Sequence, residues 1–164
     1  MRLADVWKDF FIAASGASAT LVGLVIVAIS VNIQRILQHP QLPSRGGATV
    51  GSLMLILTSS MLWLVPQPKR FLGIEILLCS LFVWMLQLWS ARHMIKAFMD
   101  SRRPFCEAAI GVATSQIQVI PFVIGALGLW LGHRSSVYWI ALGSISALAL
   151  SVFNAWILLV EILR

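Results

Sequence analysis

The stretch that decides the fold is residues 10–33, FFIAASGASATLVGLVIVAISVNI, which contains no charged residue. A transmembrane helix needs about 20 consecutive apolar residues to cross the hydrocarbon core of a bilayer. Charged residues stand on both sides of the stretch, at Lys8 and Asp9 before it and at Arg35 after it. We therefore expect residues 10–33 to form a membrane-spanning helix.

The composition of the whole chain supports this assignment. Of the 164 residues, 59% are hydrophobic and 11% are charged, and the mean hydropathy is +0.90. A soluble domain of this size cannot hide so much apolar surface, because most of its residues lie near its own surface. We do not expect the start of the chain, MRLADVWKDF, to be a signal peptide, because Asp5 and Asp9 dilute its positive charge and the apolar run behind it is too long. The chain is therefore predicted to be an integral membrane protein that uses the lipid bilayer as solvent.

Four more apolar runs follow, and turn-forming residues separate them. Prolines and a Gly-Gly pair lie before the second run, the sequence PQPKR follows it, and Pro104 precedes the fourth. The sequence GHRSS joins the last two runs, with Ser136 as the expected N-cap of the fifth helix. We predict an all-α bundle in a single transmembrane domain, 1–164, whose spans are residues 10–33, 47–65, 71–89, 108–131 and 137–163.

The basic residues predict the orientation. With five spans, one membrane face holds Arg2, Lys8, Lys69, Arg70 and Arg134, and the other holds Arg35, Arg45, Arg92, Lys96, Arg102, Arg103 and Arg164. Because cytoplasmic loops carry an excess of Lys and Arg, seven against five predicts an N-terminus outside and a C-terminus inside. Trp7, Trp63, Trp130 and Trp139 fall at the outer ends of spans and are expected to form an aromatic belt.

Residues 91–103, ARHMIKAFMDSRR, extend the third span on the inner side. Met94, Ile95 and Phe98 share one helical side, so we expect an interfacial helix here, with a basic loop as the alternative. Its basic residues would meet anionic lipid headgroups. These are Arg92, Lys96, Arg102 and Arg103.

Several functional classes lack support in the sequence. No basic run is interleaved with stacking aromatics, which disfavours nucleic-acid binding. The two cysteines form no CxxC pair, and the three histidines lie in loops on both faces, so we expect no metal site. Because no catalytic or phosphate-binding motif is present either, we expect no enzyme and no cofactor.

Small residues on three spans predict close helix packing. Lipid provides no hydrophobic drive between helices, so association depends on close approach and on hydrogen bonds. More such faces are present than one bundle needs, which predicts a homo-oligomer or contact with other membrane proteins. The packing candidates are Gly16, Thr20, Gly23, Gly47, Gly51, Gly143 and Ala147.

Two sets of residues are candidates for lining the path of a solute. The first follows one line of span one, with hydroxyls at one mouth, aliphatics in the middle and an amide at the other, as in a pore with a dewetting gate. The alternative is a packing face whose serines bond to their own helix. The line consists of Ser15, Ser18, Val22, Val25, Ile29 and Asn32.

The second set surrounds Pro121 in span four, which removes a backbone donor and breaks the helix in our interpretation. Its polar side chains either line a hydrated cavity or join helices by hydrogen bonds. We expect Gln118 to face the protein interior near Asn154, because an unpaired amide in hydrocarbon is costly. The candidates are Thr114, Ser115, Gln118, Pro121, Ser151 and Asn154.

Glu75 lies one turn inside span three. An acid within a membrane is a functional candidate by default. It is also close enough to the rim to form an ion pair with Lys69 or Arg70, which is the structural alternative.

Three stretches, ASATLVGLVIVAISVNIQRIL in span one, RGGATVG before span two and NAWILLVEILR at the C-terminus, carry a resemblance. The chain resembles a group of small, uncharacterised bacterial multi-pass membrane proteins, some of them labelled by automated transfer as modulators of the membrane-bound AAA protease. The resemblance implies a bacterial inner-membrane protein and carries over no site residues.

Three functions remain open at this point, and the third, a membrane enzyme, has no visible catalytic chemistry in the sequence. The first is an oligomeric channel or small transporter, with a polar path along span one or beside Pro121. The alternative is a non-transporting accessory or regulatory subunit that binds other membrane proteins. An exposed packing face favours the subunit, and a wet polar line favours the channel.

Overall fold

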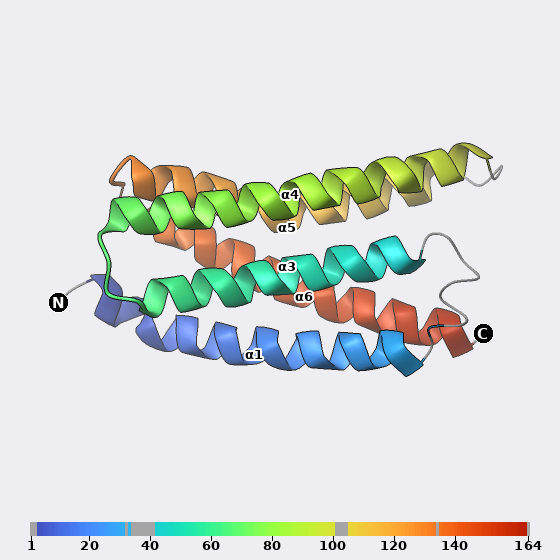
Figure 1. Ribbon diagram of the computed structural model, residues 1–164, viewed down its shortest axis with the longest axis horizontal. Coiled ribbons are helices and arrows are strands. Elements are labelled where there is room, and N and C mark those ends of the chain that lie inside the picture. The colour runs from blue at the N-terminus through green and yellow to red at the C-terminus, as the bar shows by residue number, and fades with distance from the viewer. Residues whose placement is uncertain (1–2, 32, 34–41, 101–104, 134, 164) are drawn as a thin grey trace.

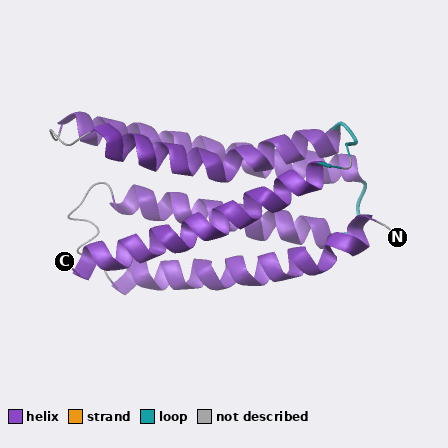
Figure 2. Cartoon of the chain, turned by 180° about the vertical axis from the view of Figure 1, so that it is seen from behind, coloured by secondary structure: helices purple, strands orange, loops and turns teal. Residues whose placement is uncertain are grey.

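The protein is an elongated bundle of antiparallel α-helices (Figures 1 and 2). The computed structural model describes residues 3–31, 33, 42–100, 105–133 and 135–163, with side chains over 6–31, 33, 46–92, 113–133 and 135–156. Within these ranges, five helices are long and apolar enough to cross a membrane. They are α1 (Leu3–Val31), α3 (Leu42–Leu64), α4 (Lys69–Asp100), α5 (Phe105–Trp130) and α6 (Ser136–Leu163). The predicted all-α transmembrane fold with five spans is confirmed.

Helix α3 is the central element of the bundle. It packs against α1, α4 and α6, whereas α5 packs mainly between α4 and α6. Helix α6 crosses the back of the bundle diagonally (Figure 2). The N-terminus and both short hairpin connections lie at one end, and the C-terminus lies at the other (Figure 1).

The two described connections follow from local chemistry. After α3, Pro66 and Pro68 interrupt the helix, and α4 begins at Lys69. After α5, Gly132 takes a φ of 87°, and the His133 amide donates to the Gly128 carbonyl at 2.8 Å. This pair of features is the Schellman C-cap, in which glycine takes the left-handed conformation at no steric cost.

Ser136 does not act as the N-cap that we predicted. It is the first residue of α6, and its hydroxyl donates to the His133 carbonyl at 2.9 Å. The side chain is also buried against Gly128, where an added Cβ would collide with it. Its position is therefore decided by close packing of α5 on α6 and not by capping.

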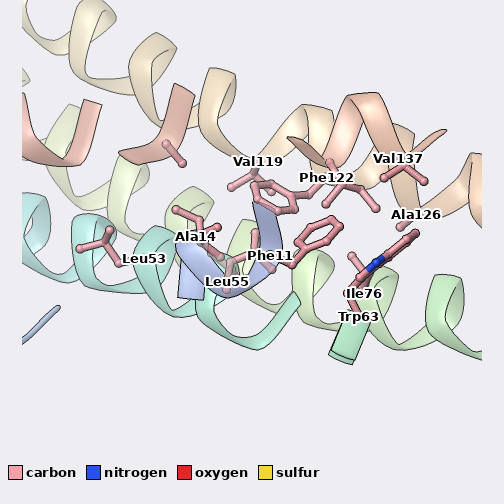
Figure 3. Close-up of a cluster of buried hydrophobic side chains, with 14 of the residues drawn as sticks. Phe11, Ala14, Leu53, Leu55, Trp63, Ile76, Val119, Phe122, Ala126 and Val137 are labelled. Carbon is pink, nitrogen blue, oxygen red and sulfur yellow. The ribbon is translucent and has the colours of Figure 1, made fainter. Parts of the chain in front are cut away.

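The apolar core runs along the inner side of α3 and joins all five helices. Phe11, Ile56, Ile76, Phe122 and Ile140 are each 0% exposed. Phe11, Ile76 and Phe122 are drawn in the close-up of this core (Figure 3). Because lipid is as apolar as these side chains, the gain from this packing is dispersion and close fit and not exclusion of water.

Trp63 belongs to this core, and the belt prediction is wrong for it. Only 7% of Trp63 is exposed, and its ring stacks on Phe11 with centroids 4.8 Å apart (Figure 3). Trp130 and Trp139 are 48% and 44% exposed, as residues of a belt would be. The position of Trp63 near the end of its helix predicts a place at the rim of the membrane. In the structure, α1 packs on α3 and buries the side chain of Trp63 in the core.

One expectation about helix continuity is corrected, and another is confirmed. Helix α5 continues through Pro121 to Trp130, so the expected break is absent. Helix α4 runs unbroken over 32 residues to Asp100. The expected interfacial helix at 91–103 therefore begins as the continuation of the third span, while residues 101–103 lie outside the described part of the chain.

Candidate functional site

Three buried polar side chains meet where α3, α4 and α5 come together. Ser52 of α3, Gln87 of α4 and Gln118 of α5 are 1%, 2% and 3% exposed. Gln87 Nε2 donates to Ser52 Oγ at 2.9 Å, and the Ser52 hydroxyl donates to Gln118 Oε1 at 2.5 Å. We call these three residues the polar cluster. It joins three helices through one hydroxyl.

The local sequence explains why Ser52 is available to its neighbours. In α3 the segment GGATVGS places small residues on successive turns, and a Cβ added at Gly51, next to Ser52, would meet only the side chain of Val83 on α4, at 3.7 Å. The Ser52 hydroxyl also lies 3.0 Å from the carbonyl oxygen of Ala48, one turn back. A serine hydroxyl in a helix normally donates its hydrogen bond to such a carbonyl alone, whereas here Gln118 Oε1 competes for the same proton.

A second cross-helix hydrogen bond lies close to the polar cluster along both helices. Trp84 precedes Gln87 by three residues on α4, and its Nε1 donates to Gln116 Oε1 of α5 at 2.6 Å. Together the two sets make a polar layer between α3, α4 and α5.

Some buried polar atoms in this bundle have no hydrogen-bond partner among the described residues. In the polar layer these are Gln87 Oε1 and Gln116 Nε2. Such atoms are costly inside a protein and are uncommon in folded structures. Elsewhere they are Ser60 Oγ, Trp63 Nε1 and Ser151 Oγ.

Gln118 was expected inside, and it is buried. Its hydrogen-bond partner is Ser52, however, and not Asn154 or Ser151. Ser151 is buried and its hydroxyl has no partner in the part of the chain that the structure describes, and Asn154 is half-buried. The sequence identified the correct helix face of α5 but the wrong opposing helix.

The expected polar line of span one packs against its own bundle. Ser18, Val22 and Val25 are buried, and Ser18 donates to the carbonyl of Ser15 within the helix. Ser15 and Ile29 are half-buried, and Asn32 lies outside the described residues. The aliphatic centre of this line is part of the hydrophobic core.

The remaining candidates of span four lie in a mixed environment. Thr114, Ser115 and Pro121 are half-buried, and both hydroxyl residues already have interaction partners. A Cβ placed on Gly143 would lie 3.2 Å from Pro121 Cβ, so this part of α5 is in close contact with α6.

The glycines divide into two groups. A Cβ added at Gly16, Gly23 or Gly47 would meet nothing within 4 Å, and at Gly51 it would make an ordinary contact with Val83. At Gly143 it would lie 2.9 Å from the Phe122 ring. Ala147 is fully buried. Of the predicted packing residues, therefore, those on α6 are used within the chain and those on α1 are not.

Sequence reasoning missed several residues of the interior. Gly73 and Gly125 permit the tightest backbone approaches, of α4 on α5 and of α5 on α6. Ser52 and Gln87 were also missed. The available signal was the polar character of α3 and the single amide in the apolar run of α4, since buried polar groups in membranes pair with one another.

The expected ion pair of Glu75 is absent among the described residues. Its carboxylate accepts a hydrogen bond of 2.7 Å from Gln67 Nε2, in the Pro66–Pro68 connection, and Lys69 and Arg70 are exposed without pairing to it. Among the described residues no group of three or more histidine, cysteine or acidic side chains is placed to hold a metal ion.

Comparison of the chain with protein-family models, with curated proteins and with solved structures found no match.

Proposed function

We propose that this chain is a non-transporting accessory subunit of a membrane assembly, which associates through the outer face of α1. This face consists of Gly16, Thr20, Gly23 and Val27, all of which are exposed. It lies opposite the line of Ser18, Val22 and Val25 that packs into the bundle. The observation that carries the proposal is the open space at both of its glycines.

The physical argument is the close approach of two backbones. Glycines on one face of a transmembrane helix let a second helix come near, and dispersion and weak hydrogen bonds then stabilise the pair. The Thr20 hydroxyl donates to the Gly16 carbonyl at 2.9 Å, so it adds no unpaired donor to such an interface. Helix α1 is also the least buried span, with 22% of its apolar window inside the bundle.

A second copy of the same chain is the partner that we propose, so that α1 packs on α1. Contact with another membrane protein is the alternative outcome. On the resemblance and the charge bias described above, we place the assembly in a bacterial inner membrane with the N-terminus outside. Arg92, which is exposed, and the basic residues that follow it would meet anionic headgroups on the inner side.

Native mass measurement in mild detergent and in lipid nanodiscs tests the assembly. We expect an oligomer for the natural chain and a monomer for Gly16→Leu with Gly23→Leu, because two large side chains hold the helices apart. Ala149→Leu, at an exposed position of α6, is the matched control and should leave the mass unchanged. A monomer for the natural chain in nanodiscs, or an oligomer that survives both α1 substitutions, would overturn the proposal.

A channel or small transporter is the second candidate, and the buried polar cluster favours it. A solute path through one copy would then pass the α3–α4–α5 junction. Liposome flux separates the candidates when it is measured with Gln118→Leu. If the cluster lines a path, flux should fall with little change in thermal stability. If it only joins helices, stability should fall, and liposomes with the natural chain should show no flux above that of empty ones.

A further inference from the structure

Gln87 holds the one atom of the polar cluster that is buried and unpaired. Its Nε2 donates to Ser52 Oγ, while its Oε1 has no hydrogen-bond partner among the described residues. Since Gln87 is 2% exposed, lipid headgroups and bulk water do not reach this oxygen. A buried amide oxygen in an apolar bundle needs a donor.

None of the three side chains donates to that oxygen in the observed arrangement. Ser52 has one proton, and both the Ala48 carbonyl and Gln118 Oε1 lie within reach of it. If the oxygen and nitrogen of the Gln87 amide exchanged places, the Gln87 oxygen could accept the Ser52 proton. Gln118 Oε1 would then lose its hydrogen bond from Ser52, and the two N–H groups of Gln87 would be without an acceptor in the cluster. One group at Gln87 therefore stays unpaired in either arrangement.

We propose that the α3–α4–α5 junction binds a buried water molecule at the Gln87 carboxamide. Water is the occupant that fits both arrangements, because it donates to an oxygen and accepts from an N–H. A cation fits only one of them, and the cluster contains no acid that would balance its charge. A second group without a partner among the described residues, the donor Gln116 Nε2, lies two residues from Gln118 on α5.

The inference does not depend on the proposed assembly through α1. The water site lies between α3, α4 and α5 of a single copy, whereas the assembly uses the outer face of α1. A monomeric chain would retain the water site, and a dry junction would leave the α1 interface unaffected.

Nuclear magnetic resonance of the isotope-labelled chain in nanodiscs tests the site directly. We expect a magnetisation-transfer signal between long-lived water and the side-chain amide of Gln87, assigned by its loss in Gln87→Met. The amide of Gln67, near the membrane surface, is the positive control for detection. Absence of the Gln87 signal, with the Gln67 signal present, would overturn the proposal.

Thermal stability provides the second test. Methionine resembles glutamine in shape and makes no comparable hydrogen bonds. If water pairs the Gln87 oxygen, Gln87→Met removes satisfied hydrogen bonds and should lower Tm by roughly 3–8 °C. If the oxygen is dry, the same change removes an unpaired acceptor together with the hydrogen bond to Ser52, so the two effects oppose each other and Tm should change by less than roughly 3 °C. Leu86→Met, at an exposed position of α4, is the control and should leave Tm unchanged. Where Gln87→Met does not fold, the resonance experiment on the natural chain decides, with the side-chain amide of Gln87 assigned through its connection to the backbone.

Discussion

Ser52 shows how much one hydroxyl can decide inside a membrane protein. It accepts from Gln87 and donates to Gln118, so it connects two helices that flank its own. Most other described serines, such as Ser59, bond only to a carbonyl of the preceding turn. The difference is one of position, because only at Ser52 do α4 and α5 bring long amide side chains within reach of α3.

We predict that Ser52→Ala destabilises the protein by about 1–3 kcal/mol. The substitution leaves a donor of Gln87 and an acceptor of Gln118 unpaired in a buried site. Thermal or denaturant unfolding in detergent micelles measures the change.

The matched control is Ser59→Ala, a buried serine of the same helix whose hydroxyl donates to Ile56 at 3.0 Å. Its loss removes a bond within one helix and should cost less than about 0.5 kcal/mol. Equal losses for the two variants would contradict a connecting role for Ser52.

At the scale of the helices, glycine has opposite roles on α4 and on α1. A Cβ at Gly73 would lie 2.8 Å from the Trp130 amide nitrogen and 3.0 Å from the Ala126 carbonyl oxygen, both in the α5 backbone. Backbone atoms cannot turn aside as a flexible side chain can. Gly73 therefore sets the distance between α4 and α5, whereas Gly23 faces open space.

We predict that Gly73→Ala lowers the free energy of unfolding by about 1–3 kcal/mol, as overpacking does in other cores. Gly23→Ala should leave it unchanged or raise it by up to about 1 kcal/mol, because alanine favours helix over glycine. Unfolding of both variants under conditions that keep the chain monomeric makes the comparison. A stable Gly73→Ala variant would mean that α4 and α5 can move apart at little cost.

At the scale of the whole molecule, the spans and their connections determine which groups face the same side of the membrane. Both short hairpin connections lie at the end that holds the N-terminus (Figure 1). The basic residues are in slight excess at the other end, which is why we expect that end in the cytoplasm.

Cysteine labelling in intact cells tests this orientation. Ser136 is buried, so the outer probe belongs at its exposed neighbour Ser135. In a background without Cys79 and Cys106, we predict that an impermeant reagent modifies Ser135→Cys and spares Ser101→Cys, a position outside the described residues. Modification of Ser101→Cys alone would show that the orientation is the opposite of the predicted one.

The class of the protein and the positions of its helices along the chain follow from the order of the residues alone. Residues 10–33 were expected to span the membrane, and the corresponding apolar segment of α1 is Val6–Val31. The expected 137–163 corresponds to α6, Ser136–Leu163. Such agreement is possible because span length depends on bilayer thickness, which is a constraint along the chain and involves no other helix.

Which face of each helix lies inside depends on how the helices pack, and the residues of one helix do not predict it. In a soluble protein, polar residues mark the outside, but lipid is as apolar as the core, so this contrast is missing. Trp63 and Trp130 both end apolar spans, yet one is buried in the core and the other is exposed. Likewise Gly16 faces open space, while Gly73 touches a neighbouring backbone. The hydrogen-bond partner of Gln118 also depends on helix packing, because a hydrogen bond between helices forms only when the bundle places one helix face against another.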